Sequence, residues 1–479
     1  MMPTGSLAGV RRRVHRLLRP MAKSVERVAV ERLGISPSTL ERVKSVTLAP
    51  SGSPLVTVDT VDLAVVDPER IRGAGLDAPR RGSQERIHAL HMAGWVLGTS
   101  SPVKTVQVRH QGRLVGSALL DRPRPEIAKR FSTIPHADRC GFRVHVGMVG
   151  LPLTFELSLW AVCEDKVRVR IATVRGRREP VQQVYQPALR PIMMTTLGRS
   201  GGTWLMRLLS EHPAIVVHRE YPYELRTARY WFHLFKVLAD PADHLRSASL
   251  TNFSRSSDVV GHNPFYPDAL ASSPDLIGWF GRDYVEDAAA FCQQSIDRFY
   301  QRVAVAQSQR DVLYFAEKFQ ENHEPSLAWE LYPDAREIFL VRDFRDTATS
   351  KLAFVGIPKG AFDAADMVRR LDKRRVHRLI ESWNDRSTHA HLVRYEELVR
   401  QPHETLTALL RYLDLDWTPP TVDGMIRRAA EETADLRRHR TTDSPEASIG
   451  RWRRDLSPEL QAACETAFGE ALATFGYGA

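Results

Sequence analysis

The fold is decided by the stretch from Ile192 to Pro213, which reads IMMTTLGRSGGTWLMRLLSEHP. Its first five residues are apolar or β-permissive, as in a short strand that is covered on both faces. A glycine-rich turn follows, and three leucines at helical spacing then precede Pro213, which ends the run. The stretch therefore predicts a buried strand, a turn and an amphipathic helix.

The turn between strand and helix predicts an anion site. Gly198, Gly201 and Gly202 allow positive φ and let a ligand approach the backbone. The first N–H groups of the following helix have no partner within it and carry a partial positive charge, so a phosphate is the natural ligand. The turn lacks the Gly-Lys-Ser/Thr ending of nucleotide kinases, because Gly202 precedes Thr203 and the cation, Arg199, comes early. A turn that only packs the strand against the helix is the alternative.

A second informative stretch, from Ile338 to Ser350, reads IFLVRDFRDTATS. A buried strand delivers Arg342 at its carboxyl end, the edge at which open α/β sheets bind ligands. A helix that starts at residue 346 or 347 would hold Ser350 on its first turn. An arginine beside a hydroxyl suits a terminal phosphate, because the guanidinium forms charge-assisted hydrogen bonds. Without the first stretch, a salt bridge between Arg342 and Asp343 is the simpler explanation.

Together the two stretches resemble the phosphate-binding motifs of the sulfotransferases, which use 3′-phosphoadenosine 5′-phosphosulfate (PAPS) as sulfuryl donor. The resemblance covers roughly residues 187–479 and points to a bacterial, carbohydrate-type branch. It implies a P-loop-type parallel sheet flanked by helices, with the donor's 3′-phosphate on Arg342 and Ser350. It also implies a 5′-phosphate loop made of Arg199, Ser200, Gly201, Gly202, Thr203 and Trp204.

Two later segments extend this resemblance. Tyr395, in VRYEELV, looks like the family's tyrosine that lies near the adenine, and packing in the core is an equal alternative. Near the C-terminus, IGRWRRDL at residues 449–456 places three arginines around a tryptophan, which suits a lid over the nucleotide. Gly450 and Arg451 are therefore expected to contact the donor, with a surface cluster as the alternative.

The reaction needs cations near the transferring group and a base for the acceptor hydroxyl. Arg199 stays protonated and is expected to act electrostatically. Lys318 follows a strand that leads to the same cleft, so it is the second catalytic cation. The cytosolic family members carry a histidine base two positions after such a lysine, whereas this chain has Gln320.

The base is therefore expected elsewhere, as in the family branches that use a carboxylate. The segment HREYPYE, residues 218–224, follows the strand after the phosphate-loop helix, where those branches carry a catalytic glutamate. Glu220 is the first candidate, Glu224 the second, and His323 and His218 are further alternates. Glu220 could instead pair with Arg219 or cap the next helix.

Residues 46–185 have a different texture. Short segments alternate apolar with polar residues between Gly, Pro and Asp turns, which predicts a mostly β, sandwich-like accessory domain. Its strands are expected at residues 56–66, 87–95, 103–110, 114–120, 141–149, 154–163 and 167–174. No catalytic constellation occurs there, so a binding or scaffolding module is the interpretation. Residues 176–180 look like the linker to the sulfotransferase-like domain at 186–479, with strands expected at 192–196, 215–218, 313–317, 337–342 and 391–394.

Charge and composition bound the setting. Residues 1–45 hold ten Lys and Arg against three Asp and Glu, so seven of the ten net positive charges lie there. They predict a basic amphipathic helical segment that either docks on the protein or lies on an anionic membrane surface. The near-neutral remainder argues against nucleic-acid binding. The four cysteines lack metal-ligand spacing, and no apolar run is long enough to span a membrane. We expect a cytoplasmic protein, with peripheral contact at the inner membrane face as an option.

The sequence thus predicts a sulfotransferase that works by in-line transfer with a glutamate general base and no metal. The acceptor is expected to be a carbohydrate, a glycolipid or a hydroxylated small molecule. The aromatic-rich segment 223–308 is expected to form much of its pocket, and the alternative is that these aromatics form an ordinary helical core. Two alternatives are an ATP-dependent P-loop phosphotransferase and a non-catalytic nucleotide-binding scaffold. The oligomeric state does not follow from the sequence.

Overall fold

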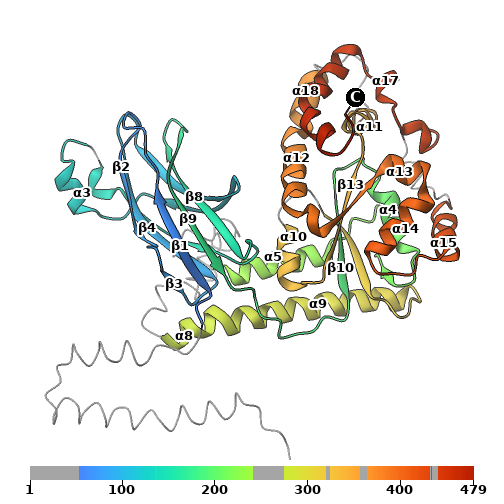
Figure 1. The fold of residues 1–479 in the computed structure, drawn as a ribbon, viewed down its shortest axis with the longest axis horizontal. Coiled ribbons are helices and arrows are strands. Elements are labelled where there is room, and N and C mark those ends of the chain that lie inside the picture. The colour runs from blue at the N-terminus through green and yellow to red at the C-terminus, as the bar shows by residue number, and fades with distance from the viewer. Residues whose placement is uncertain are drawn as a thin grey trace, which may run out of the picture.

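The computed structural model describes residues 53–134, 136–240, 274–319, 324–355, 364–431, 433 and 441–478. The basic segment predicted over residues 1–45 lies outside them. Figure 1 shows two lobes: a β-rich lobe near the N-terminus and a larger lobe in which helices surround a parallel sheet. The predicted architecture, a parallel sheet flanked by helices and preceded by a mostly β domain, is confirmed.

The N-terminal lobe is a sandwich of two antiparallel sheets whose inward-facing side chains form one apolar core. Side chains alternate between buried and accessible along each central strand, as expected where only one face of a sheet packs on a core. The six-stranded sheet has the order β3 (Gln84–Glu85), β1 (Val56–Leu63), β9 (Arg168–Arg178), β8 (Thr154–Cys163), β5 (Val103–His110), β6 (Arg113–Leu119). The three-stranded sheet has the order β2 (Ile71–Ala78), β4 (Ala89–Gly98), β7 (Gly141–Gly147).

All seven strands predicted in this lobe are present, and two further strands, β2 and β3, were missed. Strand β2 reads IRGAGLDA and lacks the β-branched alternation that marks the others. The predicted linker at residues 176–180 is partly wrong, because β9 continues to Arg178. The connection between the lobes therefore begins at Glu179.

The C-terminal lobe is built on a five-stranded parallel sheet. Its order is β11 (Ile215–Val216), β12 (Tyr314–Phe319), β10 (Arg190–Thr196), β13 (Arg336–Val341), β14 (Ala390–Arg394). Strands β10, β12 and β13 are almost completely buried, as expected for a parallel sheet with helices on both faces. All five predicted strands are confirmed, because each is a short apolar run between turn residues.

Helices cover both faces of this sheet (Figure 1). One face packs on α4 (Gly202–Ser210), α13 (Tyr395–Arg400), α14 (Pro402–Tyr412) and α15 (Pro419–Ala429). The other packs on α5 (Thr227–Ala239), α9 (Tyr284–Ala306), α10 (Glu324–Leu331), α11 (Phe344–Val355), α12 (Ala364–Arg386) and α18 (Pro458–Thr474). Shorter pieces are α3 (Pro125–Arg130), α8 (Pro274–Gly278) and α17 (Trp452–Asp455). No helix in the described ranges combines the length and apolarity needed to cross a bilayer.

A buried ion pair joins the two lobes. The guanidinium of Arg178, at the end of β9, donates to the carboxylate of Glu330 on α10, with 2.9 Å between Nη1 and Oε1. Glu330 also accepts the backbone N–H groups of Val181 and Gly150. Burial alone would raise the pKa of the Glu330 carboxyl, but the Arg178 charge and these hydrogen bonds outweigh it and lower the pKa. The carboxylate of Glu330 is therefore a fully partnered polar group at the junction of the lobes.

Candidate active site

The turn after β10 adopts the shape of an anion-binding loop. Backbone φ is +71° at Arg199 and +90° at Gly201, both in the left-handed region. A Cβ built on Gly201 would lie 2.3 Å from Cδ2 of Tyr395, so only glycine fits there. Of the three glycines, only Gly201 adopts positive φ. Gly202 instead begins α4, whose first N–H groups have no partner within the helix.

A cavity of about 570 Å³ opens above this helix terminus. Five of the six predicted loop residues line it: Arg199, Gly201, Gly202, Thr203 and Trp204. Ser200 is buried and is not among the lining residues. The cavity is thus placed where the partial positive charge of α4 favours an anion.

The second predicted motif lies on the same cavity. Arg199 Nε donates to Ser350 Oγ at 3.1 Å, and Arg342 Nη1 donates to the backbone oxygen of Arg199 at 3.2 Å. The alternative salt bridge does not form, because Asp343 pairs with Arg345 at 2.8 Å. Two stretches that lie about 150 residues apart in the sequence are therefore joined by direct hydrogen bonds.

Helix α11 starts earlier than predicted, at Phe344 instead of residue 346 or 347. Ser350 consequently lies on its second turn. Because the buried side chains of this helix still pack beside β13, Ser350 remains at the carboxyl edge of the sheet and lines the cavity.

Arg342 is a buried cation whose hydrogen-bond acceptors are neutral backbone oxygens. Its guanidinium lies 4.8 Å from the ring centroid of Tyr395 and donates to the backbone oxygen of Ser448. The Tyr395 hydroxyl lies 3.1 Å from Ser448 Oγ. Among the described residues, Arg342 Nε has no hydrogen-bond partner. A buried donor that lacks an acceptor is costly, and a bound anion would satisfy it.

Tyr395 is both a core residue and a cavity residue. Its side chain is almost completely buried, in agreement with the packing alternative, yet its ring also lines the cavity. The ring lies against Gly201 on one side and under Arg342 on the other. The same side chain thus connects the glycine-rich loop with the second motif.

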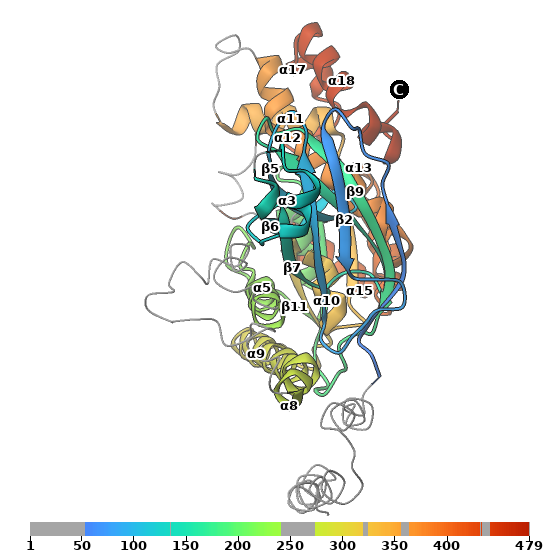
Figure 2. The same cartoon turned by 90° about the vertical axis from the view of Figure 1, so that its left-hand side faces the viewer.

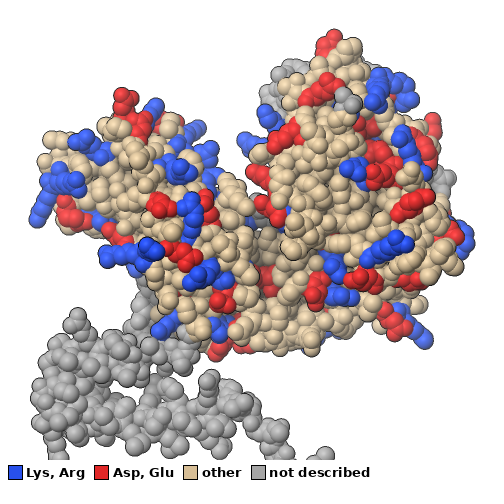
Figure 3. Space-filling model, in the orientation of Figure 1, with Lys and Arg blue, Asp and Glu red and all other residues tan. Residues whose placement is uncertain are grey.

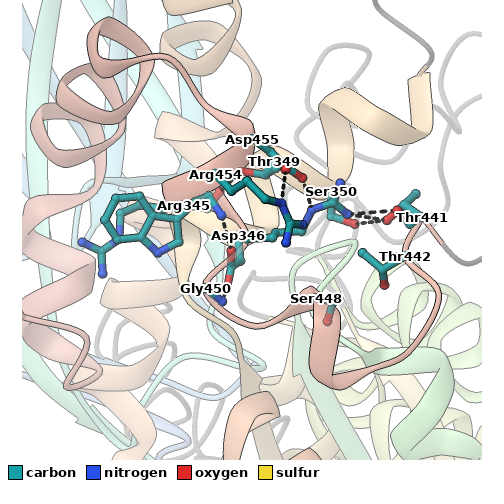
Figure 4. Close-up of polar contacts among 12 residues, drawn as sticks. Arg345, Asp346, Thr349, Ser350, Thr441, Thr442, Ser448, Gly450, Arg454 and Asp455 are labelled. Atoms are coloured by element: carbon teal, nitrogen blue, oxygen red, sulfur yellow. Dashed lines mark hydrogen bonds and ion pairs between the residues drawn. The ribbon is translucent and has the colours of Figure 1, made fainter.

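The late basic loop, residues 449–456, is hydrogen-bonded to α11, the helix that carries Ser350. Asp346 on α11 accepts the backbone N–H of Gly450 at 2.6 Å and that of Trp452 at 3.0 Å. Burial raises the pKa of the Asp346 carboxyl, an effect that these two hydrogen bonds and Arg342 only partly offset. Figure 4 shows Asp346 turned toward Gly450, so the loop is tied to the helix that carries Ser350.

Gly450 and Arg451 do not line the cavity. The Arg451 guanidinium pairs with Asp455 at 2.8 Å and donates to Thr441 Oγ1 at 3.0 Å. Thr441 does line the cavity, and its Oγ1 lies 3.4 Å from Ser350 Oγ (Figure 4). Arg451 is therefore placed to position Thr441, and its charge still lies near enough to Arg199 to lower the pKa of that guanidinium, after burial and the charge of Arg342.

Lys318 and Glu224 line the cavity beside the start of α4. Lys318 Nζ donates to Thr203 Oγ1 at 3.0 Å and to the backbone oxygen of Pro222 at 2.6 Å. It lies 3.7 Å from Glu224 Oε1. Burial lowers the pKa of Lys318 to about 8, although the nearby Glu224 carboxylate opposes this. A cation and a carboxylate therefore stand beside the terminus of α4.

The two glutamates that the sequence offered as bases differ in position. The Glu220 side chain is 77% exposed and lies 3.9 Å from the ring of His218, outside the cavity lining. The Glu224 side chain is 52% exposed and lines the cavity. His323, one of the further alternates, and Gln320 lie outside the described residues.

The segment that carries Glu224 is anchored by a buried carboxylate. Glu317, next to Lys318 on β12, accepts the backbone N–H of Ala228 at 2.6 Å and that of Arg229 at 3.2 Å, at the start of α5. The Tyr300 hydroxyl also donates to it. Burial raises the pKa of Glu317 to about 7, against the effect of these hydrogen bonds. Neighbouring residues of one strand thus hold both ends of the segment from Pro222 to Ala228.

The aromatic side chains described in segment 223–308 do not line the cavity, whereas Glu224 and Arg226 of the same segment do. Phe232 and Phe280 are buried in apolar clusters, and Tyr230 and Trp279 are exposed. For the described aromatics this agrees with the helical-core alternative; Phe265 and Tyr266 lie outside the described residues. Within the described ranges, no three His, Cys, Asp or Glu side chains gather as metal ligands would.

Sequence reasoning missed the stretch TTDSPEAS, residues 441–448. Thr441, Thr442, Ser444 and Ser448 all line the cavity. Their hydroxyl groups, which directly precede Gly450 and Arg451, were the signal that could have been used. They reach the cavity only because Asp346 and Arg451 fold the chain back over α11, which the local pattern does not reveal.

Comparison with known proteins gives one family match. Residues 191–419 match the model of the Sulfotransferase family. This range contains both phosphate-type motifs and Lys318, and it ends before the late loop. Among curated protein sequences, none matches this chain.

Several solved structures are similar at low identity. The sulfotransferase domain of the Synechococcus PCC 7002 olefin synthase is 18% identical, with 62% of this chain and 98% of that one covered and a TM-score of 0.35. A Mycobacterium avium sulfotransferase is 17% identical, with 60% and 78% covered and a TM-score of 0.31. A mouse sulfotransferase complexed with PAP is 12% identical, with 59% and 85% covered and a TM-score of 0.33. TM-scores this low do not establish a common fold, so the family assignment depends on the match of residues 191–419.

Proposed function

Because residues 191–419 belong to the sulfotransferase family, we propose that the chain transfers a sulfuryl group from PAPS to a hydroxyl group of a carbohydrate or other hydroxylated acceptor. One observation carries the donor assignment: Arg199 Nε, Ser350 Oγ and Arg342 Nη1 form a continuous set of contacts beside the terminus of α4. Two anion sites on one cavity fit a nucleotide with separate 3′ and 5′ phosphates better than a triphosphate.

The residues of the cavity fit this donor. In our proposal Arg342 and Ser350 hold the 3′-phosphate, where the unpartnered Nε of Arg342 gains an acceptor. The N–H groups of Gly202 and Thr203 hold the 5′-phosphate at the start of α4. Tyr395 supplies an aromatic surface beside both. Thr441, held by Arg451, closes the side next to Ser350.

Sulfuryl transfer also needs a base for the acceptor hydroxyl and a cation for the leaving phosphate. We assign the base to Glu224, because it lines the cavity whereas Glu220 points to solvent. Its carboxylate takes the proton of the acceptor hydroxyl, the acceptor oxygen bonds to sulfur, and the bond from sulfur to the bridging phosphate oxygen breaks. Lys318, between Glu224 and Thr203, stabilises the negative charge that develops on the leaving 5′-phosphate, and adenosine 3′,5′-bisphosphate departs.

Glu224→Gln and Glu220→Gln form a matched pair that tests this assignment. We expect Glu224→Gln to lower turnover by about 10²- to 10⁴-fold, the usual contribution of a general base, and to leave the affinity for adenosine 3′,5′-bisphosphate unchanged. Glu220→Gln should keep full turnover. The measurement is transfer of label from ³⁵S-labelled PAPS to acceptors found by screening, with the sulfated product identified by mass. Full activity in Glu224→Gln would move the role to another residue.

A further inference from the structure

The outer face of the six-stranded sheet is a second surface that the transfer reaction does not explain. Its inner face packs on the three-stranded sheet, whose own outer face is covered by α3. The outer face lies on the side of the C-terminal lobe, as the views in Figures 1 and 2 agree. At one end Gln111, in the turn between β5 and β6, hydrogen-bonds to Asp385 of α12. Elsewhere the lobes part around a groove, which Figure 3 shows.

A tryptophan stands at the centre of this sheet face. Trp160 of β8 is partly exposed, with Gln107 of β5 opposite it on one side and Arg170 of β9 on the other. Its Nε1 donates to Ser158 Oγ at 2.9 Å, which fixes the ring relative to the strand. Cross-strand neighbours on one face lie about 5 Å apart, so the ring is flanked by an amide and a guanidinium. This is an apolar plate with hydrogen-bonding groups on two sides.

The face is also basic where it is not internally paired. Arg175 pairs with Asp62 and Glu156. Arg168 and Arg170 are exposed and form none of the ion pairs found in the described part of the chain. The pKa of Arg109 is lowered by burial and then by the charge of Arg168. Arg109 and Arg168 therefore lie close enough to repel one another, with no carboxylate of the described residues between them. Such a pair of cations favours an anionic partner.

The opposite wall of the groove leads from this face to the cavity. Arg375 of α12 lines the cavity, and Asp385 of the same helix touches the β lobe. Ten helical residues span about 15 Å. Lys373, Arg374 and Arg378 are exposed on this helix, and Figure 3 shows Lys and Arg atoms on both sides of the groove. Helix α12 therefore runs from the β lobe to the proposed active site, and its exposed basic side chains lie on the part nearer the cavity.

We infer that this groove binds an acidic polysaccharide, and that it does so as part of the acceptor site, an inference that rests on the proposed function. The C–H face of a sugar ring stacks on Trp160, while Nε2 of Gln107, whose Oε1 accepts from Arg109, donates to a ring hydroxyl. Carboxylate or sulfate groups of the chain pair with Arg168 and Arg170. A chain polymer fits a groove whose α12 wall reaches the cavity at Arg375, whereas a flat bilayer cannot enter between two lobes.

Binding to the full-length protein tests the groove. The probes are polygalacturonate, neutral dextran of equal length, and oligo(dT) of equal charge, measured by calorimetry at two salt concentrations. We expect polygalacturonate to bind in a salt-sensitive manner and dextran to bind at least tenfold more weakly. Arg168→Ala/Arg170→Ala and, separately, Trp160→Ala should each weaken polygalacturonate binding at least tenfold. Arg80→Ala/Arg81→Ala removes the same charge from an exposed turn elsewhere on the lobe and should change nothing.

Three results would overturn the inference: no polygalacturonate binding, an equal loss in the Arg80/Arg81 control, or tighter binding of oligo(dT) through the same arginines. Adenosine 3′,5′-bisphosphate titrated into the same variants separates the two proposals. The groove variants should bind it like the wild type. If the wild type fails to bind the bisphosphate, the proposed function fails, and the polysaccharide titrations still decide whether the groove is a glycan site.

Discussion

At the scale of single residues, the site depends on a few side chains that each serve two neighbours. Arg342 touches the backbone of Arg199 in the first motif and that of Ser448 in the late loop. Tyr395 lies against Gly201 and under Arg342. Because these contacts connect segments that are distant in sequence, loss of one side chain is expected to disturb more than one wall of the cavity.

The protonation of Lys318 predicts a limit to activity in alkaline solution. Its pKa is lowered to about 8 because burial disfavours the ammonium, so the free enzyme loses this charge as the pH rises through about 8. If the charge stabilises the leaving phosphate, kcat/KM should fall above that pH. The measurement is a pH profile of kcat/KM from pH 6 to 10. In Lys318→Arg the cation persists, so the alkaline fall should disappear even where the overall rate is lower; an unchanged profile would contradict the assignment.

The site residues that could be predicted from the sequence are those that belong to a local sequence motif. Arg199, Arg342 and Ser350 follow strand ends, where ligands of parallel sheets bind, and all three reach the cavity. The choice between Glu220 and Glu224 depends on the direction of a side chain in a loop, which no spacing rule fixes. The two carboxylates are four positions apart, and only the fold around Pro222 turns one inward and the other outward.

At the scale of elements, α11 and the late loop act as one unit. Asp346 receives the N–H groups of Gly450 and Trp452, one helical turn before Ser350. The guanidinium of Arg345, which is also on α11, lies 4.0 Å from the centroid of the Trp452 ring. The loop therefore cannot leave α11 without exposing a buried carboxylate and a tryptophan.

Replacement of Asp346 tests this unit. Asp346→Asn keeps the shape but places an amide nitrogen where one backbone N–H now donates, and a lost charge-assisted hydrogen bond costs about 1.5–3 kcal/mol. We expect the affinity for adenosine 3′,5′-bisphosphate to fall about tenfold or more in calorimetry. Asp414→Asn is the control, since that carboxylate pairs with Arg336 at the far end of β13. Equal affinities in the two variants would show that the loop does not shape the donor site.

The elements themselves were largely predictable. The parallel strands are short, mostly apolar runs of two to seven residues bounded by turn residues. The sandwich strands alternate in polarity, so burial dictates both patterns. Strand β2 was missed because Gly73 and Gly75 leave room for the Trp95 side chain, a packing reason that appears only across the sheet. The start of α11 at Phe344 was also missed, because only Arg342 and Asp343 separate it from β13.

At the scale of the whole molecule, the ion pair of Arg178 and Glu330 links the two lobes. Both side chains are at most 4% exposed, so removal of one leaves a buried charge. Arg175, three residues earlier on β9, forms ion pairs that are exposed to solvent. The two arginines offer a comparison within one strand.

Arg178→Ala is predicted to lower the free energy of unfolding by about 3–5 kcal/mol, whereas Arg175→Ala should change it by less than about 1 kcal/mol. Denaturant titration of the full chain measures both. Because the pKa of Glu330 is held below its ordinary value of 4.5, the stability it contributes is present above that pH and is lost as the pH falls through the lowered pKa. This acid-dependent part should be missing in Arg178→Ala. Similar losses in the two variants would mean that the pair does not hold the lobes together.

The donor site is the centre of this account, and calorimetry with adenosine 3′,5′-bisphosphate tests it most directly. The wild-type chain should bind this nucleotide, and Arg342→Ala should weaken binding by about 10- to 150-fold, since a charge-assisted contact is worth about 1.5–3 kcal/mol. Arg336→Ala, at the other end of the same strand, should bind like the wild type. No binding by the wild type, or equal affinity in Arg342→Ala and Arg336→Ala, would contradict the assignment of this cavity to a sulfuryl donor.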